Sequence, residues 1–267
     1  MDWCPDDSPG MIVTPHSESR ARRFVKESAV SALLTAPAEA ACPPRSAVRA
    51  AFAASVAALD TEQVVPVATA LALRLGADGL LHVLGSGHSQ LLALEAYHRA
   101  GAPAWVAPLI DRRLSPARGT GGTAAERRPA LGAQLAARVL APGSRARALL
   151  VVSTSGHTPA VAEAARLARA AGLLTIALTA RPDANPLVAV CDHALCSGVA
   201  GTDAAVDVGG TLMAPQSTVS GAVLLHALLA ETEARRPERA VLVSVNLEGG
   251  VARNRSLLRR YPHLHHP

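Results

Sequence analysis

The stretch Ala148-Leu149-Leu150-Val151-Val152-Ser153-Thr154-Ser155-Gly156-His157-Thr158-Pro159 decides the fold. Its first five residues are all apolar, and an alanine-rich helical pattern covers residues 159–171. Proline suits the first turn of a helix because the N–H that it lacks would be unpaired there. A short strand without polar alternation that leads straight into a helix is typical of a parallel sheet covered on both faces.

The same plan occurs earlier in the chain and indicates the fold class. Residues 80–84 are an apolar run, Gly85-Ser86-Gly87-His88-Ser89 follows, and residues 90–100 have a helical pattern that ends at Gly101. Because apolar runs and helical stretches alternate, we expect an α/β fold whose ligands bind at the carboxyl ends of the strands. The other expected elements are helices over 46–59, 61–75, 130–140, 215–234 and 254–260, strands over 104–110, 174–179, 188–195 and 240–245, and loops over 111–129 and 198–210.

The composition narrows the function classes. The 267 residues are 49% hydrophobic but only 2% aromatic, so the core consists of Ala, Leu and Val and few rings are available to stack on nucleic-acid bases. The net charge of +5 is concentrated in residues 235–267, which hold seven Arg and two Glu. No basic face over the whole domain is therefore expected, and nucleic acid is not a predicted partner.

The cysteines and the apolar runs exclude other classes. Four cysteines in a chain of this length do not form a disulfide framework. Cys191, His193 and Cys196 could be a metal site, but their spacing is not a common zinc pattern, and buried free thiols are the preferred interpretation. No cofactor or metal is predicted. No run of about 18 apolar residues exists, so no membrane partner is expected and a cytoplasmic protein is predicted.

The chain divides into a leader, one domain and a tail. Residues 1–44 are rich in Pro and Ser and are expected to be a disordered leader or the product of a misplaced start, with a weak twin-arginine export signal at Arg22-Arg23 as the alternative. The domain covers residues 45–261. Residues 262–267, with three histidines, are expected to be a solvated tail.

The two Ser-Gly-His segments predict an anion site. We call residues 85–89 the first loop and residues 153–158 the second loop. Each joins a strand to a helix N-terminus, where free N–H groups and hydroxyls suit a phosphate, and a third Ser-Thr helix start lies at Ser217-Thr218. Ordinary helix capping is one alternative. A dinucleotide site with Asp111 as the ribose-binding acid is another, but the first loop lacks the third glycine.

The second loop, its helix and the following strand over residues 174–179 resemble the signature of the sugar isomerase (SIS) domain. The first loop through Arg99-Ala100-Gly101 resembles one bacterial SIS subgroup, UPF0309. Residues 215–222 and 244–250 are similar to later motifs of that subgroup. The resemblance covers about residues 46–261. It departs from the subgroup at residues 251–254, where the subgroup tends to carry acidic residues and a histidine, and at residues 111–129.

The resemblance implies a flavodoxin-like fold with a parallel sheet of five or six strands, helices on both faces and helical residues preceding the sheet. It also implies a homodimer that binds a phosphorylated sugar. The phosphate would be held by Ser153, Ser155 and Thr158, while the first loop would lie beside the sugar. We further hypothesise that Arg253, Arg255, Arg259 and Arg260 lie near the ligand and attract the phosphate.

Candidate catalytic groups follow from the needs of aldose–ketose isomerisation, which without a metal requires a base and an acid. We select His88 in the first loop, Glu95 in the next helix and Glu248 in a Gly-rich loop, with Glu126 as a weaker candidate. The predicted substrate-binding residues are Gly85, Ser86, Gly87, Ser89, Ser153, Thr154, Ser155, Gly156, His157, Thr158, Asp203, Ser217, Thr218 and Asn246.

Two function classes remain open. The first is an enzyme that isomerises a sugar phosphate or performs related proton-transfer or lyase chemistry. The second is a phosphosugar-binding module without catalysis. Residues 1–45 are too short and too rich in proline for a helix-turn-helix, which disfavours a transcription factor. The sequence does not identify the sugar.

Overall fold

The computed structural model describes residues 44–181, 183, 185–199 and 203–265. The predicted leader lies outside the described residues except for Pro44, which begins helix α2 (Pro44–Ala57). Within the described part, no helix combines the length and the apolar character needed to cross a membrane.

A five-stranded parallel sheet forms the centre of the fold, in the order β2-β1-β3-β4-β5. The strands are β1 (Leu80–Gly85), β2 (Val106–Pro108), β3 (Ala146–Val152), β4 (Leu174–Thr179) and β5 (His193–Cys196). The apolar runs at 80–84, 148–152 and 174–179 form strands as predicted. Their side chains are buried on both faces, as expected of a parallel sheet covered by helices.

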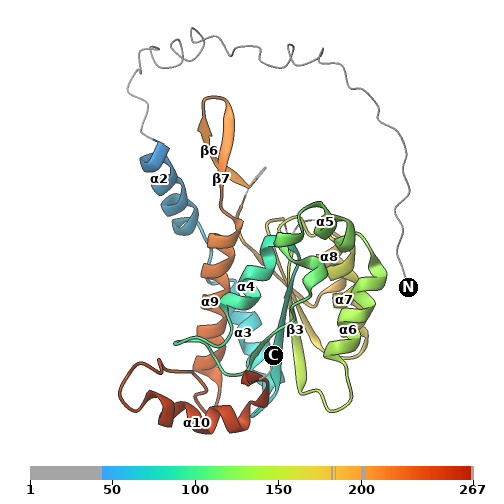
Figure 1. The fold of residues 1–267 in the computed structure, drawn as a ribbon, viewed down its shortest axis with the longest axis vertical. Helices are drawn as coiled ribbons and strands as arrows, with labels where there is room; N and C mark the ends of the chain where they lie inside the picture. The colour runs from blue at the N-terminus through green and yellow to red at the C-terminus, as the bar shows by residue number, and fades with distance from the viewer. Residues whose placement is uncertain (1–43, 182, 184, 200–202, 266–267) are drawn as a thin grey trace, which may run out of the picture. The chain divides into compact units, whose positions relative to one another are not determined.

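Helices cover both faces of the sheet (Figure 1). One face packs against α3 (Val64–Leu75), α4 (Gln90–Glu95) and α9 (Ser217–Arg235). The other packs against α6 (Pro129–Val139), α7 (Pro159–Ala170) and α8 (Pro186–Val190). Small residues let these helices approach closely: a Cβ on Gly132 of α6 would collide with the backbone of Ala160 in α7.

Several segments differ from the sequence-based expectation. The 111–129 segment is not a plain loop, because it contains the short helices η2 (Arg112–Leu114), η3 (Pro116–Arg118) and α5 (Thr120–Glu126). The strand expected over 188–195 is split: Asn185 caps α8 by accepting from the Val188 N–H at 2.9 Å, and only His193–Cys196 joins the sheet.

The segment expected to be a Gly-rich loop over 198–210 holds a strand. β6 (Ala204–Val208) pairs antiparallel with β7 (Thr211–Pro215), and both residues of the Gly209-Gly210 turn have positive φ angles. The strand expected over 240–245 does not form; this segment instead makes an isolated antiparallel bridge between Val241 and Pro103 and backbone hydrogen bonds to residues 101–104. The sheet therefore has five strands rather than six.

The C-terminal part packs at the end of α9 opposite to the β6–β7 hairpin (Figure 1). It consists of α10 (Gly250–Arg260) and η4 (Pro262–Leu264). The predicted tail is thus partly folded: His263 Nε2 lies 2.9 Å from the Val106 carbonyl, and the Tyr97 hydroxyl donates to the His263 carbonyl at 2.8 Å.

Candidate functional site

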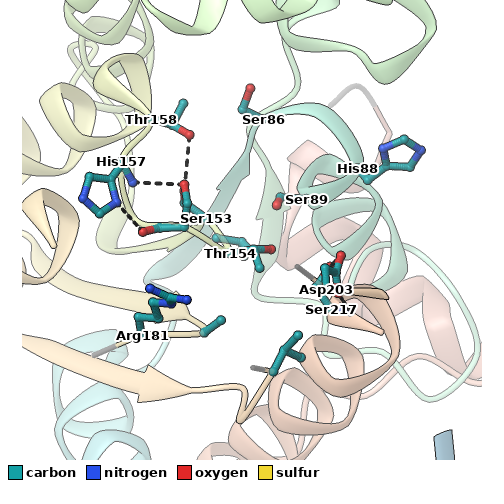
Figure 2. A pocket seen from close by; sticks show the side chains of 14 residues that line it. Ser86, His88, Ser89, Ser153, Thr154, His157, Thr158, Arg181, Asp203 and Ser217 are labelled. Atoms are coloured by element: carbon teal, nitrogen blue, oxygen red, sulfur yellow. Dashed lines mark hydrogen bonds between the residues drawn. The ribbon is translucent and has the colours of Figure 1, made fainter. Parts of the chain in front are cut away.

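A cavity of about 490 Å³ lies at the carboxyl ends of β1, β3 and β4. Both predicted loops contribute to it, together with the residues around the start of α9, and Figure 2 shows their side chains around the space. The polar residues that line it are Ser86, His88, Ser89, Ser153, Thr154, Ser155, His157, Thr158, Arg181, Asp203 and Ser217. The structure therefore brings together most of the predicted substrate-binding residues. Gly85, Gly87 and Gly156 shape the two loops without lining the cavity.

The second loop holds its hydroxyls by hydrogen bonds within the loop. The Gly156 N–H donates to Ser153 Oγ at 3.2 Å, and the Ser153 and Thr158 hydroxyls lie 3.3 Å apart. Thr158 occupies the N-cap position of α7, but its side chain makes no capping hydrogen bond. Capping does not explain this hydroxyl, so the start of α7 keeps N–H groups that can bind an anion.

His157 adds an imidazole whose tautomer is fixed by its neighbour. Its Nδ1 lies 2.7 Å from the Ser155 carbonyl, and because a carbonyl only accepts, Nδ1 carries the proton. In the neutral ring, Nε2 then has a free lone pair. The His157 side chain can therefore accept a proton from a ligand.

The first loop is supported by a carboxylate from α5. Ser86 donates its hydroxyl proton to Glu126 Oε2 at 2.6 Å and makes no helix-capping bond. Glu126 is the last residue of α5, and its half-buried side chain is held close to the site through this contact. His88 lies on the opposite side of the cavity from His157 (Figure 2).

The start of α9 is occupied by an acidic side chain of the chain itself. Asp203 Oδ1 accepts from the N–H groups of Gln216 and Ser217 at 2.9 and 2.6 Å, and Oδ2 accepts from the Ser217 hydroxyl at 2.7 Å. Asp203 has a φ of 73°, which aspartate tolerates better than most residues. These two N–H groups are therefore occupied by Asp203, and phosphate binding at the third Ser-Thr helix start stays a prediction.

Arg181 is a lining residue that the sequence analysis missed. It directly follows Thr179-Ala180 at the carboxyl end of β4, and its side chain lies on the same side of the cavity as the second loop (Figure 2). Its guanidinium is the one arginine side chain in the lining, as far as the described residues go. The rule that ligands bind at the carboxyl ends of parallel strands could have identified it.

Comparison with known proteins gives a clear family. The SIS domain profile matches residues 47–180, half of the chain. This chain is a SIS-domain protein of the UPF0309 family. A UPF0309 protein of Brucella canis is 31% identical over 221 residues, which cover 76% of this chain and 90% of the relative. The UPF0309 protein of Brucella anthropi is 31% identical over 204 residues, with 70% and 84% coverage.

Solved structures are more remote. The phosphoheptose isomerase of Francisella tularensis is 17% identical, with a TM-score of 0.42 and coverage of 78% of this chain and 98% of that one. The NanR protein of Vibrio vulnificus, complexed with ManNAc-6P, is 16% identical, with a TM-score of 0.45 and coverage of 86% and 73%.

Two predicted residues of the SIS domain lie at a separate hollow. Glu95 and Thr218 line a mostly apolar depression of about 530 Å³ between α4 and α9. The Glu95 carboxylate contacts Arg99 and lies 3.2 Å from His226 Nε2. Within this chain, Glu95 is not brought to the hydroxyl-lined cavity, so its catalytic role stays a prediction.

The C-terminal candidates also lie away from the cavity. Asn246 and Glu248 are exposed in the segment before α10, at the far end of α9 from the site (Figure 1). The expectation that the arginines of residues 253–260 lie beside the ligand is wrong. None of them lines the cavity, and Arg260 instead pairs with Glu238 and lies over the Tyr261 ring.

The geometry gives little support to the dinucleotide site and the metal site that the sequence left open. Asp111 does not line the cavity; it accepts two hydrogen bonds from the Arg113 side chain, which lower the pKa of its carboxyl. Cys191 is a buried thiol, and burial raises its pKa to about 12. Among the described residues, no three His, Cys, Asp or Glu side chains are grouped so that they could hold a metal ion.

Proposed function

We propose that the 490 Å³ cavity binds a phosphorylated sugar and that its histidines move a proton on that sugar. The observation that carries this proposal is the second loop, where four hydroxyls and the start of α7 line a space next to Arg181. This donor set matches the needs of a phosphate dianion. Membership of the SIS-domain family supports the same ligand class.

The proton-transfer step would use groups on opposite sides of the ligand. His157 Nε2 is a possible proton acceptor, and His88 on the other side is a possible donor. Isomerisation would move a proton from one carbon to its neighbour and a second proton between the carbonyl and hydroxyl oxygens, so atoms and charge balance without a cofactor.

A thermal-shift screen against hexose, pentose, heptose and amino-sugar phosphates tests binding. We expect sugar phosphates to raise the melting temperature and the double variant Ser155→Ala with Thr158→Val to lose most of that increase, because two phosphate donors are removed. Ser144→Ala, at a turn before β3, is the control and should respond like the wild type. An unchanged ligand response in the double variant would show that the second loop does not bind phosphate.

The second candidate function is a phosphosugar-binding module without catalysis. It is favoured by one observation: the predicted catalytic carboxylates Glu95 and Glu248 lie outside the cavity. An NMR assay in D₂O separates the two candidates. Exchange of a sugar C–H for deuterium, or a new sugar phosphate, indicates an enzyme, whereas binding without either indicates a sensor module.

We also propose that the protein is cytoplasmic and that it forms a homodimer. The dimer interface would be the face formed by α4 and α9. Leu91 and Val219, which are 41% and 37% exposed, line the hollow together with Ala222 and Val223, and Leu94 on the same short helix as Leu91 is 51% exposed. Apolar residues grouped on a surface are typical of an interface. Light scattering after size exclusion should give twice the 27.4 kDa chain mass, and Leu94→Glu should reduce it to one chain mass. A monomeric wild-type protein would exclude this interface.

A further inference from the structure

The β6–β7 hairpin exposes an apolar surface at one end of α9 (Figure 1). Leu212 and Met213 are neighbours in β7, so their side chains point to opposite faces of the strand, and both are more than half exposed. Helix α2 lies beside β6 but has no buried residue of its own. A two-stranded hairpin is only marginally stable by itself, and an uncharged apolar edge strand is a surface on which another chain packs. The hairpin therefore has the properties of a contact surface.

A second apolar surface lies at the opposite end of α9. We call Val245, Leu247 and Val251 the C-terminal patch, because all three side chains are 57–63% exposed. Val245 and Val251 line the same depression of about 240 Å³ at the start of α10, so the exposed side chains are grouped rather than scattered. The patch also contains the motif over 244–250, which the proposed phosphosugar site does not use.

The surface of α9 between these two ends suits a second copy of the chain. A hollow of about 530 Å³ lies along its first half and one of about 460 Å³ along its second half, and His226 lines both. His226 is the tenth of the 19 residues of α9. The first hollow has eight lining residues, whereas a stable interface takes about 20–30 residues from each partner. A homodimer through this hollow therefore needs further contacts.

Twofold symmetry allows the two α9 helices to pack either parallel or antiparallel. In the parallel arrangement the C-terminal parts of both copies meet. Residues 235–267 hold seven Arg and two Glu, so like charges would then face each other. In the antiparallel arrangement, with a crossing near His226, each C-terminal part lies beside the partner's hairpin, whose two strands carry Asp207 as their one charged residue. The charges therefore favour the antiparallel arrangement, which also brings the two apolar surfaces together.

We infer that the β6–β7 hairpin of each subunit packs on the C-terminal patch of its partner in a dimer with antiparallel α9 helices. The contact occurs twice, once at each end of the paired helices, because the twofold axis repeats it. Leu212 and Met213 then cover the partner's exposed valines and leucine. The inference rests on the proposed homodimer and adds the contacts that the hollow between α4 and α9 lacks.

Mixing two charged variants tests the inference. One variant, Leu212→Glu with Met213→Glu, changes the hairpin, and the other, Val245→Lys with Leu247→Lys, changes the C-terminal patch. Each variant alone buries charged side chains in both contacts of its own dimer. We expect the dimer dissociation constant, measured by sedimentation velocity, to rise at least about a hundredfold in each.

An equal mixture of the two variants should recover dimers with a dissociation constant within about tenfold of the wild-type value. Each heterodimer has one contact that pairs glutamates with lysines and one contact without substitutions. Recovery also shows that both variants are folded. Contacts between two hairpins, or between two C-terminal patches, would leave a charged surface against an apolar one and would give no such recovery.

Leu140→Glu is the control, because Leu140 is an exposed leucine at the end of α6, on the other face of the sheet. It should stay dimeric. If Leu94→Glu gives monomers but both charged variants remain dimeric, or if the mixture does not recover dimers, the inference is wrong while the homodimer through α4 and α9 stands. If the wild-type protein is a monomer, the proposed homodimer itself fails, together with this contact.

Discussion

At the scale of single residues, Gly156 decides the shape of the second loop. Its φ is 69°, and a Cβ at this position would collide with the side chain of Asn185. Asn185 is buried and caps α8 by accepting from the Val188 N–H at 2.9 Å. The glycine therefore lets the second loop pack directly on the residue that begins α8, and it fixes where the loop hydroxyls lie.

We predict that Gly156→Ala lowers the free energy of unfolding by about 2–4 kcal/mol, since it combines a positive φ, a steric collision and a disturbed helix cap. Chemical denaturation measures this change. Gly172→Ala is the control, because Gly172 also has a positive φ, 86°, but its Cβ would meet nothing within 4 Å. That variant should lose only about 1–2 kcal/mol. Equal losses in the two variants would show that the contact with Asn185 is unimportant.

At the scale of helices and strands, the sequence predicts best where a buried apolar run borders a helix. The strands at 148–152 and 174–179 are such runs, and they form as expected. The run at 240–245 is equally apolar but does not join the sheet, because its backbone bonds to the turn over residues 101–104 before β2 instead of to a strand. Whether a segment finds a partner strand depends on the tertiary structure, and the local sequence pattern carries no information about that.

The β6–β7 hairpin is different, because its signal was present and was overlooked. Val206, Val208 and Leu212 flank Gly209-Gly210, and a glycine pair between two such segments favours a tight hairpin turn. The antiparallel pair ends at Ala204 and Pro215, so this hairpin places the carboxylate of the preceding Asp203 at the start of α9. The role of Asp203 as a helix cap could be derived only after that connection was known.

The same distinction applies to the site. Both loops were identified from their residue types and from their position after strands, and the structure brings them to one cavity. The contact between Ser86 and Glu126 could not be predicted, because the two residues are 40 positions apart and Glu126 lies in the segment over 111–129 that was expected to be a loop. Arg181 belongs to no motif, and only its position just after β4, at the strand ends where ligands bind, could have identified it.

At the scale of the whole molecule, two apolar layers enclose the sheet, and His82 of β1 is a polar exception within it. Its Nδ1 is buried without a hydrogen-bond partner among the described residues, as is Nδ1 of His263 in η4. Burial, helped by the nearby His263 and Arg138, lowers the pKa of His82 to about 4. Burial also lowers the pKa of His263. Folding thus favours the neutral form of both rings, that of His82 in the sheet and that of His263 in the C-terminal segment.

This arrangement predicts a loss of stability in acid. The unfolded chain binds a proton at His82 near pH 6.5, whereas the folded protein does so only near pH 4, so the free energy of unfolding falls as the pH drops through this window. Over the full window the loss from His82 is about 3 kcal/mol. Denaturation curves between pH 7.5 and 4 should show this slope, and His82→Gln should be flatter. His265→Gln, exposed beyond η4, should retain the wild-type slope. Glutamine does not titrate in this pH range. If the stability of His82→Gln falls as steeply with pH as that of the wild type, other groups must cause the acid sensitivity.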